Sequence, residues 1–275
     1  MGHRPDEPWP HSSGRQWDEP PPDELPRLAS PPAPLTHGRP VGKLRPGKAL
    51  LIALILTGLA AVLGGGVLLG RELARRPSGA EIKAAVRLEV SSRWQRLTAG
   101  KIFPASITYS DAEGVTTTAH LVGIAPPASC KAALEARGAA AVNTAGCATV
   151  LRATYVDASG TLLATVGVAV MTSTHAARQA YVQVNSRQFA FGVRAVRFSG
   201  TIANHFGNEQ REVFANAYLS GPYLFLATGG YADGRKSASQ IVSPYLPALG
   251  MGVMTSVENA LTHVGNACNL KDIQC

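Results

Sequence analysis

The chain of 275 residues predicts an α+β domain that follows a disordered tail and a single transmembrane helix. Three observations predict this architecture. An apolar run without charges covers residues 49–70, β-branched runs joined by Asp/Gly turns begin after residue 104, and Ala-rich or evenly spaced apolar segments lie between those runs. The domain is expected to be an antiparallel sheet with packed helices in the order ββαββαβββα.

Residues 1–48 are rich in proline and poor in aliphatic side chains. Such a segment cannot bury enough apolar surface to offset its ordering entropy, so we expect a disordered tail with polyproline II character. A Pro-recognising partner is one reading of its PPPDELP and SPPAPL stretches, and a solvated tether is the other.

The run at residues 49–70 is long enough to cross a bilayer, because about 20 helical residues span its hydrocarbon core. A cleavable signal has a shorter apolar stretch near the N-terminus. A buried core helix is the alternative, and three consecutive glycines at 64–66 disfavour it. We therefore predict a retained signal anchor.

The cysteines decide the orientation, since basic residues flank both ends of the span equally. All four cysteines follow the span, in two sequence-local pairs that are typical of disulfides in an oxidising compartment. We therefore expect a cell-membrane protein with residues 1–48 in the cytoplasm and the C-terminal domain outside. Four cysteines allow three connectivities, and the most economical pairs Cys130 with Cys147 and Cys268 with Cys275.

Residues 71–100 predict a juxtamembrane helix that leads into the domain at residues 101–275. Ser78 and Glu81 have the spacing of a capping box. The apolar residues that follow form one helical stripe, which consists of Ile82, Val86, Val90, Trp94 and Leu97.

Two strand pairs within the domain flank DAEG at 111–114 and DASG at 157–160, and both turns predict hairpins. Helices are expected at 127–142, where Ser129 is the cap, and from Ser173 or Thr174 onwards. Three strands at 194–203, 212–220 and 223–232 should then precede a last helix, which carries Leu249, Val253, Val257 and Leu261 at spacing four.

The sequence contains none of the nucleophile-elbow, zinc-protease, P-loop or dinucleotide-binding motifs. It therefore predicts no catalytic, cofactor-binding or metal-binding residues, and a protein that is not an enzyme. An enzyme whose site assembles only in space stays an alternative. Its acid–base residue types would come from His120, His175, His205, His263, Asp157 and Asp233.

The formal net charge of +8 includes no run of four basic residues, so a nucleic-acid partner is not expected. Arg152, Arg194, Arg197 and Arg211 either gather on one face to meet an anionic lipid or envelope polymer, or they lie on a solvated sheet face.

Asp233 and Arg235 lie in the glycine-rich stretch GGYADGRKS, which predicts either a turn or a ligand loop that binds an anion. Within the predicted span, Ala53, Thr57, Ala61 and Gly65 recur every four residues. This small-residue face suits a homodimer through the span, although such faces also arise by chance.

The stretches GCATVLRATYVDASGTLLATVGVAV and GPYLFLATGGYADGR, with the two local cysteine pairs and the single span, resemble a group of uncharacterised actinobacterial single-pass membrane proteins. Residues 100–275 are also similar in layout to the extracytoplasmic sensor domains of mycobacterial receptor kinases. The resemblance implies two disulfides and an antiparallel sheet with helices. The chain has no kinase domain before the span.

Together these patterns favour a non-catalytic single-pass membrane protein whose external domain binds or senses an envelope ligand or partner protein. A structural subunit of an envelope, secretion or division complex is the alternative.

Overall fold

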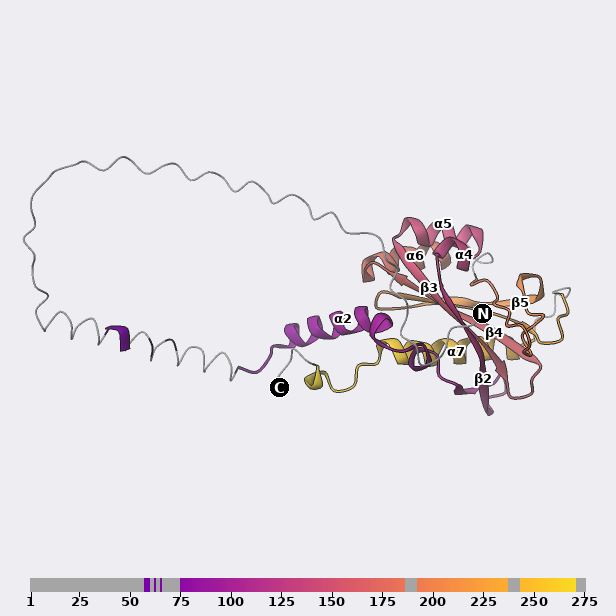
Figure 1. Cartoon of the computed structure of the whole chain (residues 1–275), viewed down its shortest axis with the longest axis horizontal. Helices are drawn as coiled ribbons and strands as arrows, with labels where there is room; N and C mark the ends of the chain where they lie inside the picture. Colours follow the sequence, from indigo (N-terminus) through magenta and orange to yellow (C-terminus); the bar gives the residue numbers. More distant parts are fainter. Residues whose placement is uncertain are drawn as a thin grey trace, which may run out of the picture. The chain divides into compact units, whose positions relative to one another are not determined.

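The computed structural model describes residues 57–59, 62, 65, 75–185, 192–236 and 243–270. Two compact units divide the chain, one of residues 12–77 and one that includes residues 78–275. The second unit contains every helix and strand discussed below (Figure 1).

Six antiparallel strands form one sheet in the order β1-β2-β3-β4-β6-β5. The α+β class with an antiparallel sheet is therefore confirmed. The strands are β1 (Ser106–Ser110), β2 (Thr116–Ala128), β3 (Cys147–Asp157), β4 (Leu162–Met171), β5 (Arg211–Ser220) and β6 (Tyr223–Tyr231).

Helices cover both faces of this sheet, with α4, α5 and α6 on one side and α7 on the other (Figure 1). All ten residues of β4 are buried, as expected for a central strand with both faces covered. The helices are α2 (Gly79–Arg96), α3 (Ala99–Ile102), α4 (Cys130–Ala133), α5 (Ala136–Thr144), α6 (Thr174–Asn185) and α7 (Tyr245–Thr262), with short 3-10 turns η1 (Asn208–Gln210) and η2 (Ala267–Asn269).

The face that α7 covers holds the larger core. All four residues of the predicted stripe on α7 are fully buried there. Two rings from β6, Tyr223 and Phe225, pack edge to face in the same core, and the Tyr223 hydroxyl donates a hydrogen bond to the carbonyl of Val90 in α2. That bond and the packing of the α2 stripe fix the C-terminal half of α2 on the domain.

Asp/Gly turns close both hairpins that the sequence predicts. Asp111 Oδ1 accepts two backbone N–H groups at 2.9 Å each, from Glu113 and Val115. Asp157 Oδ1 likewise accepts from Thr161 and Leu162, at 2.9 and 2.8 Å. These Asx-type bonds replace strand pairing where the chain reverses.

The helix caps also follow the sequence. Ser78 and Glu81 form the predicted capping box at the start of α2. Ser129 accepts the N–H of Ala132, and Ser173 accepts the N–H of Ala176. Serine oxygens thus take orphan amide protons at three helix starts.

Two sequence expectations are wrong. The predicted strand at 194–203 is not a strand: Val193 makes a single bridge to Leu134, and the following residues form turns. The helix expected at 127–142 is two helices, α4 and α5, because Leu134 and Glu135 between them are extended and hydrogen-bond to residues 192–194.

The disulfide between Cys130 and Cys147 is present, with Cα atoms 6.4 Å apart. It joins the first residue of α4 to the first residue of β3. Cys268 is also disulfide-bonded, and its predicted partner, Cys275, lies outside the described residues.

Candidate anion-binding site

Residues 192–198, here called the crossing segment, pass over the sheet on the side of α4, α5 and α6. Val193 lies over Gly167 of β4: a Cβ at Gly167 would be 2.6 Å from a Val193 methyl group. Phe198 lies over Gly123 of β2, where a Cβ would be 2.5 Å from the ring. These glycines leave room for the segment to lie against the strands.

Two buried threonines fasten the crossing segment to the sheet. The Thr154 hydroxyl donates to the carbonyl of Val196 at 3.0 Å, and the N–H of Val196 donates to Thr165 Oγ1 at 3.2 Å. The two hydroxyls are 2.8 Å apart. Because Thr154 gives its proton to Val196, Thr165 is the donor between them, and each hydroxyl is satisfied.

The crossing segment, fixed in this way, places Arg194 beside two arginines of the sheet. The three residues, here called the arginine row, are Arg152 of β3, Arg194 of the crossing segment and Arg211 of β5. Arg194 Nε donates to the carbonyl of Leu134 at 3.0 Å. Arg211 Nη2 lies 2.8 Å from Glu135 Oε1, the side chain of Arg211 being 9% exposed. Neither Arg152 nor Arg194 forms an ion pair with any residue that the structure describes.

The electrostatics of the row show an excess of positive charge in a half-buried place. Burial lowers the pKa of Arg152, and the charge of Arg194 lowers it further. Burial also lowers the pKa of Arg211, Arg194 acts in the same direction, and Glu135 opposes both. Arginine nevertheless stays protonated at neutral pH. The row therefore keeps its positive charges in a partly buried place, which lowers the stability of the fold.

The clearest sign of this cost is Arg152 Nε, which is buried and has no hydrogen-bond partner among the described residues. A buried donor without an acceptor costs about 1–3 kcal/mol. A carboxylate or phosphate oxygen bound here would accept that proton and offset the repulsion between Arg152 and Arg194.

A groove of ≈ 500 Å³ adjoins the row at Arg194. Its polar wall consists of Arg194, Lys131, Ser129 and Asn143, and its floor is formed by alanines of α4 and α5. Two cations and no acid line it, so its charge also suits an anion. The disulfide holds α4, and hence Lys131, in this wall.

Replacing Thr165 by valine should weaken the fastening. The N–H of Val196 and the hydroxyl of Thr154 would each lose a partner in a buried place, so we expect the free energy of unfolding to fall by about 1–3 kcal/mol. Chemical denaturation measures it. Thr116→Val, at an exposed threonine of β2, should stay within about 0.5 kcal/mol of wild type, and an equal loss in both variants would contradict the assignment.

The predicted ligand loop has its two charged residues paired with each other. Arg235 Nη2 lies 2.6 Å from Asp233 Oδ2, both side chains being more than half exposed. The guanidinium also lies 4.3 Å from the centre of the Tyr231 ring. These bonds from Arg235 lower the pKa of Asp233. The Asp233 carboxylate therefore competes with any anion for Arg235.

The acid–base residue types are placed in separate elements. His120 is in β2, His175 in α6, His205 in the turns before β5, and His263 directly follows α7. Asp157 is occupied by its turn. Among the described residues, no three His, Cys, Asp or Glu side chains are grouped to hold a metal ion.

The predicted tail and most of the predicted span lie outside the described residues, which include only Thr57 and Gly65 of the small-residue face. No helix in the described part of the chain has both the length and the apolar character needed to cross a bilayer.

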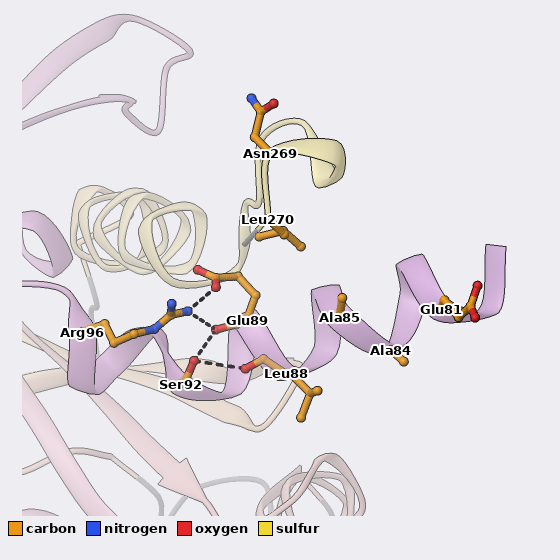
Figure 2. A pocket seen from close by; sticks show the side chains of 9 residues that line it. All are labelled: Glu81, Ala84, Ala85, Leu88, Glu89, Ser92, Arg96, Asn269 and Leu270. Carbon is orange, nitrogen blue, oxygen red and sulfur yellow. Dashed lines mark hydrogen bonds and ion pairs between the residues drawn. The ribbon is translucent and has the colours of Figure 1, made fainter. Parts of the chain in front are cut away.

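A second groove, of ≈ 660 Å³, runs along α2 (Figure 2). Seven of its residues come from one side of α2, and the other two, Asn269 and Leu270, come from the chain end beyond α7. The α2 residues are Glu81, Ala84, Ala85, Leu88, Glu89, Ser92 and Arg96.

Comparison with known proteins gives no relative: no protein-family model, no curated protein and no solved structure matches this chain.

The sequence singled out the arginines but not their arrangement. Arg152, Arg194 and Arg211 do gather, whereas Arg197 is exposed and its guanidinium lies against Gly207. Glu135 and Lys131 were missed because they lie in a segment that predicts an unbroken helix. An acid between two helices carries no local signal of its distant partner.

Proposed function

We propose that this protein is a non-catalytic binding module that a single span holds in the cell membrane, with its domain outside and its Pro-rich tail in the cytoplasm. The arginine row binds an anionic envelope ligand through carboxylate or phosphate oxygens. The observation that carries the proposal is Arg152 Nε, a buried donor beside the charge of Arg194 with no acceptor in the described residues.

Binding should be measured on the full chain in lipid nanodiscs of neutral lipid, titrated with inorganic phosphate in a low-chloride buffer at pH 7. We expect saturable binding by calorimetry. Arg152→Gln should weaken it at least about tenfold, because a hydrogen bond to a charged group contributes about 1.5–3 kcal/mol.

Arg178→Gln is the matched control. Arg178 is exposed on α6, on the same side of the sheet, so the change removes the same charge without touching the row. Its affinity for phosphate should equal that of wild type. Absence of saturable binding, or equal weakening in both variants, would refute the proposal. Because Arg152→Gln removes an ill-placed charge, it should not lower stability, and thermal unfolding separates the two effects.

The topology has its own test, in intact cells with a membrane-impermeant thiol reagent. The described cysteines are disulfide-bonded, so we expect labelling only after reduction with an impermeant reductant. Labelling that requires a broken membrane would place the domain in the cytoplasm and contradict the proposed location.

A further inference from the structure

The arginine row already binds one oxyanion, the carboxylate of Glu135. Its Oε1 lies 2.8 Å from Arg211 Nη2, so the charge of Arg211 is balanced within the chain. Arg152 and Arg194 have no such acid among the residues that the structure describes, and neither has Lys131 in the wall of the adjoining groove. Three positive charges of the row and the groove therefore lack an acidic partner in the described part of the chain.

Arg194 connects the row to the groove. Its charge acts on both Arg152 and Arg211, and its side chain lines the groove together with Lys131. The bond from its Nε to the carbonyl of Leu134 holds the guanidinium in place. The two Nη groups of Arg194 have no acceptor among the described residues. They are therefore available to a ligand that contacts both the row and the groove.

We infer that this ligand is a phosphate monoester, whose phosphoryl group lies on Arg152 and Arg194 and whose organic group lies in the groove. The inference rests on the proposed function and narrows its ligand from any carboxylate or phosphate. A phosphomonoester carries a charge of about −1.5 to −2 at pH 7 and three acceptor oxygens. A carboxylate carries one negative charge and two oxygens. It would leave more positive charge unbalanced and fewer donors satisfied in this half-buried place.

The groove suits an uncharged and partly apolar organic group. Its volume of ≈ 500 Å³ lies within the range of about 300–1,000 Å³ that is typical of small-ligand clefts. A phosphoryl group alone would fill only a small part of it. The floor consists of Ala132, Ala136, Ala139 and Ala140, whose methyl groups offer contact but no hydrogen bond. The cations thus suit the phosphoryl group, and the floor favours a chain of methylene groups over water.

A series of small ligands tests the phosphoryl group, by calorimetry on the full chain in nanodiscs of neutral lipid at pH 7.5, with empty nanodiscs as the blank. Methyl phosphate is a monoester with a charge of about −2, whereas dimethyl phosphate and acetate each carry one negative charge. We expect methyl phosphate to bind at least about tenfold more tightly than either of the others, because it balances more of the three positive charges. Lys131→Gln should reduce that preference, since it removes one of these charges.

Hexyl phosphate tests the groove. A fully buried methylene tightens binding about fourfold and a half-buried one about twofold, so its five further methylenes should give about thirtyfold over methyl phosphate. Ala140→Gln should remove most of this gain and leave the affinity for methyl phosphate unchanged, because Ala140 is an exposed residue of the floor. Ala80→Gln is the matched control, at an exposed alanine of α2 outside the groove, and it should keep the full gain.

Equal affinities for methyl phosphate, dimethyl phosphate and acetate would overturn the monoester as the ligand. A hexyl gain that is absent, or that Ala140→Gln leaves intact, would overturn the placement of the organic group in the groove. Both results can occur while inorganic phosphate still binds and Arg152→Gln still weakens it, so they separate this inference from the proposed function. Absence of any phosphate binding would overturn both.

Discussion

Replacing Gly230 by alanine should lower the free energy of unfolding by about 3 kcal/mol, at the upper end of overpacking effects. Gly230 is in β6, and a Cβ there would be 2.4 Å from the backbone oxygen of Gln210 and 2.7 Å from the ring of Phe206. Phe206 is fully buried and Gln210 is 7% exposed, so neither can move without disturbing the core. Urea denaturation of the full chain gives the value.

Gly79→Ala is the matched control. Gly79 begins α2, and a Cβ there would have no atom within 4 Å. Its stability should stay within about 0.5 kcal/mol of wild type.

Because Gln210 precedes Arg211, Gly230→Ala should also weaken phosphate binding. A loss of less than about 1 kcal/mol would show that the chain before β5 is free to shift, contrary to the packing described.

Removing the disulfide with the double change Cys130→Ser and Cys147→Ser should cost about 3 kcal/mol, the loop-closure term for a separation of this size. The two cysteines are 17 residues apart. The disulfide holds the four-residue helix α4, which is too short to be stable alone. The groove wall at Lys131 should loosen as well.

Denaturant unfolding of the double variant against wild type, both under non-reducing conditions, measures this loss. Lys131→Gln in the wild-type background removes the charge of Lys131 and leaves the disulfide and α4 in place. It should weaken phosphate binding without changing the free energy of unfolding. Unfolding free energies of the double variant and wild type that agree within about 1 kcal/mol would contradict the role assigned to the disulfide.

The features that local chemistry determines could be predicted from the sequence. Asp111 and Asp157 form their turns through side-chain bonds to nearby amides, and such bonds need no distant partner. The apolar residues at spacing four on α7 are buried, as that spacing predicts. The Cys130–Cys147 pairing followed from proximity in sequence.

The crossing segment could not be predicted, because its backbone partners are not other strands. Its β-branched residues favour a strand, but its backbone hydrogen bonds go to the short extended stretch between α4 and α5 and to the side chains of Thr154 and Thr165. Threonine is an ordinary residue in a strand, so Thr154 in β3 and Thr165 in β4 give no sign in the sequence that they bind another segment. The division of α4 from α5 has the same cause, since Leu134 pairs with Val193.

The candidate site depends on that same segment. Arg194 lies beside Arg152 and Arg211 only because residues 192–198 cross the sheet from β4, where Val193 covers Gly167, to β2, where Phe198 covers Gly123. Without the crossing, three arginines at scattered positions look like an ordinary solvated face. A buried guanidinium without an acceptor is a property of the assembled sheet and leaves no pattern in the sequence.

The most direct measurement is the NMR signal of the Arg152 Nε–H group in the full chain in nanodiscs, followed during a titration with inorganic phosphate. The signals of Arg152 and Arg194 should move and saturate together at the calorimetric affinity, while that of exposed Arg178 stays fixed. An Arg152 signal that does not move while phosphate binds would place the anion elsewhere and contradict the arginine row as the binding site.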